Sequence, residues 1–233
     1  MTSLSETLPL SWHRASVARY LEGIEISFNS VAGRIIAERL PVRCARDPIR
    51  PCLLLWACVA NGGDTADALP VAAAFDLFDR FMLLHDELAD VSAESIARWG
   101  LGQSLNAGDA LYALGFRMLA SDVGDPERRL EAARIAGEAV LEAIEGRETA
   151  LEGRCALTGA ALQAGAVIGG ASGEVALAFA SAGRALGMAS EMTDTGGARR
   201  FAQQALALLQ PHTRKEDLDA FAEVALYVAR RTA

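Results

Sequence analysis

Residues 50–90 read RPCLLLWACVANGGDTADALPVAAAFDLFDRFMLLHDELAD. Two long apolar runs are separated here by Asn-Gly-Gly, a combination that is typical of the end of a helix. Asp64 or Thr65 can cap the turn that follows, and Pro70 then opens the second run. The stretch therefore predicts two consecutive helices, of which the second ends in a cluster of acidic residues.

Helical patterns recur along the rest of the chain, and strand patterns are weak everywhere. Beyond the opening stretch, helices are expected at 12–40, 103–120, 126–151, 157–169, 173–192, 198–209 and 215–231, with a loop or a short helix over 92–102. No repeat, low-complexity tract or linker interrupts this pattern. We expect an all-α fold with a single domain over residues 1–233.

The composition narrows the class of protein. The 233 residues carry 30 acidic and 22 basic side chains, and the resulting net charge of −8 argues against nucleic acid as a partner. No apolar run has the length of a membrane-spanning helix, and the first residues do not resemble a signal peptide. The four cysteines form no Cys-x-x-Cys pair, which favours reduced thiols in a cytoplasmic protein.

The acidic cluster sits at an unfavourable place. Asp86 and Asp90 are four residues apart and share a helix face, with Glu87 beside them. Like charges at this spacing destabilise a helix end, and the partial negative charge of the helix C-terminus adds to the cost. A Mg²⁺ ion would compensate, because it binds one or two carboxylates together with phosphate oxygens. The alternative is a solvated acidic helix end, and the spacing alone leaves both open.

Residues 50–90, followed by LNAGDALYALGFRMLA at 105–120, resemble the trans-polyprenyl diphosphate synthase family. In that family an RP helix, a GG stop, an LP.AAA.E helix start, an HDD..D motif and an AGD.L motif come in this order. The resemblance implies an isoprenoid-synthase-like helical bundle around a central cavity. It also implies that acidic helix ends hold Mg²⁺ on the diphosphate of an allylic prenyl substrate.

The resemblance assigns roles to three groups of residues. The metal ligands would be the acids Asp86, Glu87, Asp90, Glu191 and Asp194, of which Asp86, Asp90 and Asp194 would be catalytic. The diphosphate would contact Arg50, Arg98 and Thr158, where Arg98 is read as a remnant of the family's RRG segment; an alternative alignment leaves that segment out. Phe81 and Met82 would form the floor of the tail pocket, and their alternative role is ordinary core packing.

The second acidic motif departs from the family pattern. Residues 189–198 read ASEMTDTGGA, which retains a single motif aspartate, Asp194. Glu191, Asp194 and Thr195 are spaced at i, i+3 and i+4, so on a continuous helix they would share one face and could still offer oxygens to a metal. The alternative is an exposed helix end.

The positions that resemble the second-substrate site depart further. Asp47 and Asp79 stand where the family has a lysine and the histidine that faces isopentenyl diphosphate, and Leu157 replaces another lysine. Carboxylates at these positions would repel a diphosphate. The alternative for Asp79 is a structural ion pair with Arg80.

These departures lead to three functional hypotheses. The first is a terpene-synthase-like enzyme that ionises an allylic prenyl diphosphate without isopentenyl diphosphate. The second is a divergent polyprenyl diphosphate synthase, a prenyltransferase that condenses isopentenyl diphosphate. The third is a non-catalytic regulatory subunit of a prenyl synthase. The resemblance implies a homodimer, or a heterodimer with a complete prenyl synthase, with residues 69–78 and 105–116 as the interface.

Overall fold

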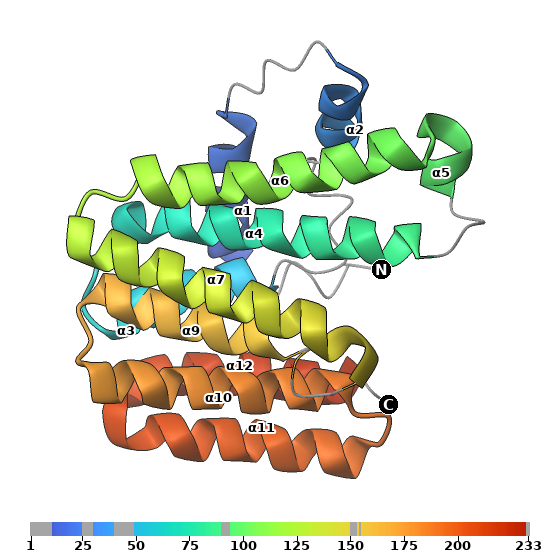
Figure 1. Cartoon of the computed structure of the whole chain (residues 1–233). Helices are drawn as coiled ribbons and strands as arrows, with labels where there is room; N and C mark the ends of the chain where they lie inside the picture. The colour runs from blue at the N-terminus through green and yellow to red at the C-terminus, as the bar shows by residue number, and fades with distance from the viewer. Residues whose placement is uncertain are drawn as a thin grey trace.

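The computed structural model describes residues 11–24, 30–39, 49–89, 94–149, 153 and 155–231. All regular secondary structure within these residues is helical (Figure 1), so the all-α prediction is confirmed. The helices are α1 (Ser11–Glu22), α2 (Val31–Arg39), α3 (Ile49–Ala60), α4 (Thr65–Leu88), α5 (Glu94–Trp99), α6 (Leu101–Ser121), α7 (Pro126–Thr149), α9 (Ala156–Gly169), α10 (Gly173–Glu191), α11 (Thr195–Leu209), the 3₁₀ turn η3 (Gln210–His212) and α12 (Lys215–Arg231).

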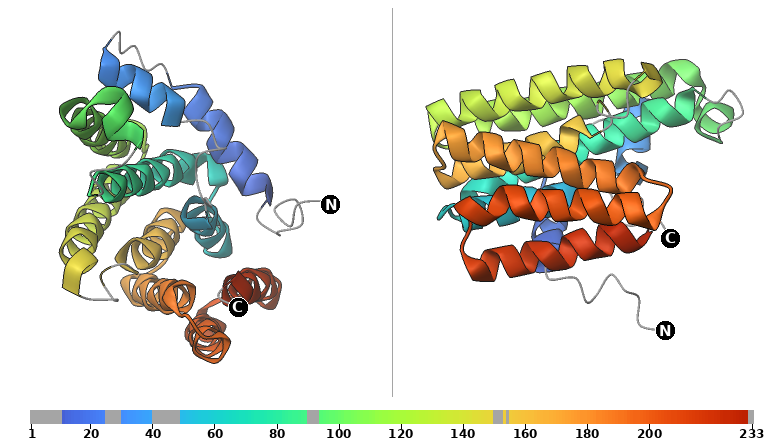
Figure 2. Two further views of the ribbon diagram at one scale, coloured as in Figure 1. Left: turned by 90° about the vertical axis from the view of Figure 1, so that its right-hand side faces the viewer. Right: turned by 90° about the horizontal axis from the view of Figure 1, so that it is seen from below.

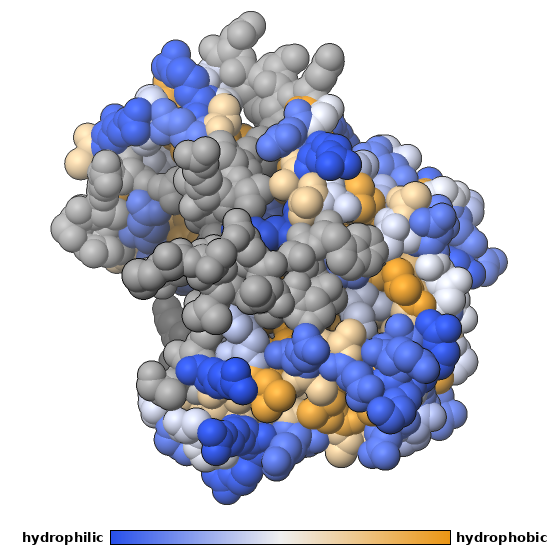
Figure 3. All heavy atoms as spheres, turned by 180° about the vertical axis from the view of Figure 1, so that it is seen from behind, coloured by the Kyte–Doolittle hydropathy of each residue, from blue (hydrophilic) through white to orange (hydrophobic). Residues whose placement is uncertain are grey.

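The long helices lie roughly alongside one another. α6 packs along α4, α9 packs against α3, α7 and α10, and α11 joins α10 to α12 (Figure 1). α1 and α2 cross this bundle on one side, where α1 contacts α3 and α4 and α2 contacts α6 (Figure 2). On the face seen in Figure 3, apolar side chains form small patches among hydrophilic ones. None of the described helices is long and apolar enough to cross a membrane.

Glycines allow the backbone of the central helix α9 to come into direct contact with the backbones of α3 and α10. A Cβ atom at Gly183 of α10 would lie 2.5 Å from the carbonyl oxygen of Thr158 in α9. On the opposite side, a Cβ atom at Gly165 of α9 would collide with the carbonyl oxygen of Leu54 in α3. Since such contacts are impossible for any residue with a Cβ, these glycines bring α3, α9 and α10 together. Thr158 thereby comes within reach of α3.

Two apolar clusters fill the bundle. One surrounds α4, where Phe75 and Phe78 are fully buried and the ring of Phe78 lies 5.0 Å from that of Phe116. The other surrounds Trp56, whose ring lies 4.9 Å from Phe221 and 5.8 Å from Phe179. The apolar residues of 69–78 belong to the first cluster. The prediction that this segment forms a dimer interface is therefore wrong, because the chain buries it in its own core.

Several predicted helix boundaries differ from the structure. The single helix expected at 12–40 is wrong, because α1 ends at Glu22 and its last turn closes at Gly23, whose amide bonds back to the carbonyl oxygens of Arg19 and Tyr20. Glycine favours such helix ends. α4 begins at Thr65 instead of at Pro70, since Asp64 Oδ1 accepts a hydrogen bond from the Ala66 amide at 2.9 Å. The acceptor at the N-cap outweighs the proline as a start signal.

Candidate active site

A cavity of about 290 Å³ opens between five helices. Its described lining combines four charged and four apolar side chains: Arg50 of α3, Asp79, Met82, Leu83 and Asp86 of α4, Ala143 of α7, Leu157 of α9 and Glu191 of α10. The C-terminal parts of α4 and α10, more than 100 residues apart in sequence, thus share one cavity. The acids would repel an anion by themselves, so this lining suits an amphipathic anion with an apolar tail only if a cation bridges the anion and the carboxylates.

Helix periodicity explains what α4 contributes. Asp79, Met82 and Asp86 follow one another at intervals of three and four residues, so they lie on one face of the helix. The side chain of Asp79 is 13% exposed, Met82 is half-buried and Asp86 is exposed. Exposure therefore rises along this face, which places Asp86 at the open mouth of the cavity and Asp79 at its inner end.

The acidic end of α4 is held against α6. The ring of His85, next to Asp86, lies 4.5 Å from Phe81 and packs on Gly108 of α6, where a Cβ atom would be 2.5 Å from His85 Nε2. The Nε2 atom also lies 3.8 Å from Oδ1 of Asp109. Because this contact needs a glycine at position 108, the AGD motif has a structural role in positioning the end of α4.

Arg50 is the centre of a polar group at the inner end. Its Nε donates to Thr158 Oγ1 at 2.9 Å and its NH1 donates to Asp79 Oδ1 at 2.7 Å. Burial raises the pKa of the Asp79 carboxyl group, and the Arg50 guanidinium opposes this shift. The structure thus brings together the predicted diphosphate contacts Arg50 and Thr158, and adds a carboxylate that competes for the same arginine.

Asp79 does not pair with Arg80 as predicted. Arg80 Nε instead donates to Asp76 Oδ2 at 2.5 Å, and both side chains are buried, 6% and 3% exposed. Side chains four apart face each other on a helix and neighbouring ones do not, which explains this pairing. Burial raises the pKa of Asp76, and the charge of Arg80 opposes the shift.

The second acidic motif is divided by a helix break. α10 ends at Glu191, Met192 and Asp194 have extended backbones, and α11 begins at Thr195. Asp194 caps α11, because its Oδ1 accepts the amide hydrogen of Gly197 at 2.6 Å. The predicted shared helix face of Glu191, Asp194 and Thr195 is therefore wrong. Glu191 lines the cavity, whereas Asp194 is absent from its described lining.

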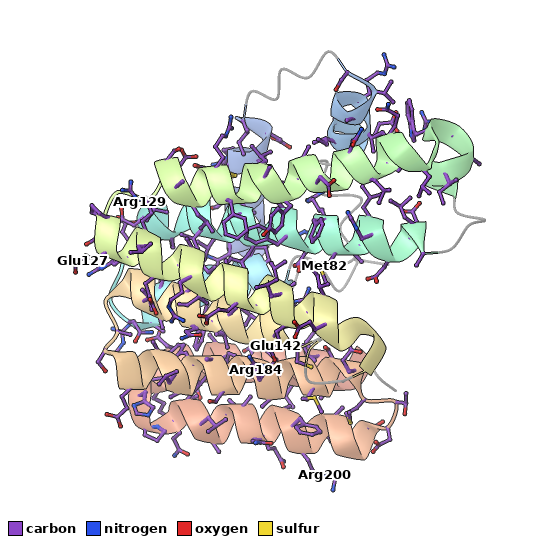
Figure 4. The ribbon with its side chains drawn as sticks, viewed as in Figure 1. Met82, Glu127, Arg129, Glu142, Arg184 and Arg200 are labelled. Carbon is purple, nitrogen blue, oxygen red and sulfur yellow. The ribbon has the colours of Figure 1, made fainter. Side chains whose placement is uncertain are left out.

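An ion pair joins the α7 and α10 walls of the cavity. Arg184 of α10 and Glu142 of α7 form two hydrogen bonds of 2.5 Å each, and the two side chains point toward one another in Figure 4. The bond from Arg184 holds the pKa of Glu142 below its usual value. Glu142 precedes the cavity residue Ala143, and Glu191 lies two turns beyond Arg184, so this pair connects the two walls close to the cavity.

Two predicted site residues lie elsewhere. Arg98 pairs with Glu38 of α2 at 3.0 Å, and its guanidinium carbon lies 4.7 Å above the ring of Trp99. Phe81 is buried against His85 and against Tyr112 of α6, with a ring separation of 5.3 Å from Tyr112. Neither residue lines the cavity, so Phe81 serves core packing and the pocket role falls to Met82, on the side of α4 nearer to α7 (Figure 4).

The carboxylates of the cavity fit a hard divalent cation. Asp86 and Glu191 offer oxygen donors on facing walls, and Mg²⁺ commonly binds one or two carboxylates plus phosphate oxygens. Asp90 lies outside the described residues. Within the described part of the chain, no group of three or more potential ligands is close enough to hold a metal by itself. The ligand roles of Asp86, Glu87, Asp90, Glu191 and Asp194 remain predictions, and a substrate phosphate would have to complete the site.

Sequence comparison identifies relatives of the chain. No protein-family profile matches the chain. A geranylgeranyl diphosphate synthase of Methanosarcina mazei is 30% identical over 184 residues, which are 68% of this chain and 56% of that protein. The chain belongs to the trans-polyprenyl diphosphate synthase family. It spans about half the length of the curated relatives that it matches.

Solved structures of prenyl synthases share the fold of this family member. A geranylgeranyl pyrophosphate synthetase from the archaeon Geoglobus acetivorans superposes with a TM-score of 0.87 at 18% identity, covering 99% of this chain and 100% of that one. The small subunit of geranyl diphosphate synthase from Antirrhinum majus superposes with a TM-score of 0.80 at 19% identity, covering 94% and 99%. At these identities the likeness establishes the isoprenyl synthase fold.

Proposed function

We propose that the protein is a prenyltransferase of the isoprenyl diphosphate synthase type, which binds an allylic prenyl diphosphate in the cavity between α4 and α10. One observation carries this proposal: Asp86 and Glu191 line the same cavity as an apolar wall. The names of its relatives, which are prenyl diphosphate synthases, favour this activity over ionisation without a second substrate. At about 290 Å³ the cavity lies at the small end of ligand pockets, which favours a short prenyl chain.

In this proposal, different residues of the cavity bind the metal and the prenyl tail. Asp86 and Glu191 at the mouth bind Mg²⁺, which when bound supplies electrostatic stabilisation to the diphosphate leaving group. Met82, Leu157 and Ala143 receive the prenyl tail and exclude water. The allylic C–O bond breaks with its electron pair on the diphosphate. The double bond of isopentenyl diphosphate then forms the new C–C bond, and a proton leaves for the released diphosphate.

A second candidate is ionisation of the allylic diphosphate without isopentenyl diphosphate. It is favoured by the pairing of Arg50, which is the single cation of the described cavity lining and already binds Asp79 at 2.7 Å. A second diphosphate would find no other cationic side chain in this described lining. In the first candidate Arg50 therefore has to serve the second diphosphate as well as Asp79.

We also propose that the chain works as a dimer, with itself or with a complete prenyl synthase. Exposed apolar side chains on α6 and α7 support an interface there, since they would otherwise face water: Leu101, Leu105, Tyr112, Leu130, Leu141 and Ile144. Similarity to the fold of a solved small subunit supports the heteromeric form. In that form the chain would regulate a catalytic partner.

Incubation with C10, C15 and C20 allylic diphosphates and Mg²⁺, with and without isopentenyl diphosphate, tests the proposal. A longer prenyl diphosphate that forms only with isopentenyl diphosphate is the expected result. A product from the allylic diphosphate alone would favour the second candidate. If all substrates stay intact, both enzymatic candidates are refuted, and a change in the product length of an added complete synthase would establish the regulatory role.

Two aspartates on α4 provide a matched control for this assay. Asp86→Asn removes a carboxylate at the cavity mouth, whereas Asp67→Asn removes an exposed one in the first turn of the same helix. We expect Asp86→Asn to lower the rate by about 100-fold or more, because several kcal/mol of charge stabilisation are lost. Asp67→Asn should leave the rate unchanged. Equal rates for the two variants would remove Asp86 from the proposed site.

A further inference from the structure

The ion pair between Arg50 and Asp79 lies at the inner end of the cavity. Arg50 NH1 lies 2.7 Å from Asp79 Oδ1, and the two side chains are 29% and 13% exposed. Thr158 holds the Nε side of the same guanidinium at 2.9 Å. The guanidinium therefore has one edge bound to a hydroxyl group of α9 and the other to a carboxylate that a phosphate could replace.

We propose that Asp79 stands in for a phosphate group at Arg50, so that diphosphate binding at the inner end of the cavity transfers Arg50 from Asp79 to the diphosphate while Asp79 takes up a proton. The inference takes its ligand class, a diphosphate, from the proposed function. It adds Asp79 to that site as a residue that determines when the diphosphate binds. Asp79 then favours the state without ligand and makes binding depend on pH.

The surroundings of Asp79 explain why its carboxylate takes up a proton when Arg50 binds a phosphate group. Once Arg50 binds a phosphate group, the Asp79 carboxylate would share a poorly hydrated site with a second anion. The neighbouring charges on α4 already form their own pair, Asp76 with Arg80. The other charged groups of the described lining are the carboxylates Asp86 of α4 and Glu191 of α10, and the α7 and α9 walls contribute Ala143 and Leu157, which carry no charge.

Among the described groups that act on Asp79, the cations are Arg50 and Arg80, and Arg80 is already paired with Asp76, so protonation is the route by which Asp79 becomes neutral. Burial already raises the pKa of Asp79 while Arg50 opposes the rise, so withdrawal of Arg50 moves this pKa further upward. Because the bound state then holds more protons than the free state, affinity falls as pH rises, by up to about tenfold per pH unit for one coupled proton. This dependence is present between the pKa that Asp79 has while it is paired with Arg50 and the higher pKa that it has once Arg50 binds the phosphate group, and it is absent above the second value.

Calorimetric titration of the full chain with inorganic pyrophosphate and Mg²⁺ tests the inference. Measurement in two buffers of different ionisation enthalpy yields the number of protons taken up on binding. The wild type should take up about one proton more than Asp79→Asn, and Asp79→Asn should bind about tenfold more tightly. Asp219→Asn, an exposed carboxylate paired with Lys215 on α12, is the matched control and should behave as wild type.

A double-mutant cycle with Arg50→Gln tests whether Asp79 affects pyrophosphate binding through Arg50. If Asp79 acts through Arg50, Asp79→Asn should have no effect on affinity or proton uptake in the Arg50→Gln background. Asp79→Ser is a second neutral variant in case Asp79→Asn does not fold. Pyrophosphate binding with equal affinity and equal proton uptake in wild type and both Asp79 variants overturns the inference alone. Absence of binding in wild type and variants overturns the diphosphate site and the inference together.

Discussion

Gly183 lies where two helices touch, and its replacement by alanine should separate them. The added Cβ atom would lie 2.5 Å from the carbonyl oxygen of Thr158 and 2.8 Å from the Cα atom of Gly159. Ordinary contacts between heavy atoms are about 3.5 Å, so α9 and α10 must move apart by about 1 Å. Both clashing atoms belong to the backbone, and no change of rotamer can relieve the contact.

The magnitude follows from two opposing effects. Overpacking of a close interface costs up to about 3 kcal/mol, and alanine recovers about 1 kcal/mol of helix propensity relative to glycine. Gly183→Ala should therefore lower the free energy of unfolding by ~2 kcal/mol. For a chain of this size, the melting temperature should fall by about 4–8 °C.

Gly137 of α7 is the matched control. It also lies inside a helix, and an added Cβ atom would meet Phe116 Cζ at 3.8 Å, an ordinary contact. Gly137→Ala should therefore raise the free energy of unfolding by ~0.5–1 kcal/mol through helix propensity alone. Denaturant unfolding followed by circular dichroism measures both variants. If Gly183→Ala proves as stable as Gly137→Ala, the close approach of α9 and α10 is refuted.

Three further predictions concern charged and titratable groups. Asp76→Asn should destabilise the fold by ~3–5 kcal/mol, because the Arg80 guanidinium stays buried and cannot lose its proton; in the double variant Asp76→Asn/Arg80→Met, equilibrium unfolding should show most of the stability restored. Asp194→Ala should cost ~1 kcal/mol as the loss of a helix cap, equally with and without Mg²⁺ and pyrophosphate in thermal melts, and a loss seen only with Mg²⁺ would make Asp194 a ligand instead. Burial lowers the pKa of His13 from 6.5 to about 4, so between these values the unfolded chain binds the extra proton. The free energy of unfolding measured across this window should therefore decrease by up to ~3 kcal/mol as the pH is lowered from 6.5 to about 4. His13→Gln should remove this pH dependence.

Local patterns in the chain predicted most of the helices, and they failed where a tertiary contact or a cap outweighs periodicity. The apolar spacing over 12–40 fits one helix, yet α1 ends at Glu22 before the glycine at position 23. Residues 69–78 look equally suited to a dimer interface or to a core. Their complete burial follows from the packing of α4 against α3, α6 and α9, which no local pattern contains.

Within the site, sequence reasoning found the residues whose chemistry is visible at short range. Arg50, Met82, Asp86 and Glu191 were predicted and do line the cavity. Ala143 and Leu83 were missed, because an alanine or a leucine on a helix carries no sign of the cavity it faces. The cap formed by Asp194 had a signal, an aspartate followed by Thr-Gly-Gly, which favours the start of a helix.

By itself the sequence determined the helical class, the family and the acidic end of α4, because these depend on spacing and residue type within a few turns. Tertiary structure alone decided the partners of the charges that pair between helices: Arg50 with Asp79 and Thr158 across three helices, and Arg184 with Glu142. The reason is physical. Ion pairs and cavities depend on how closely whole helices approach, and that distance is set by backbone contacts such as Gly183 on Thr158, far apart in the chain.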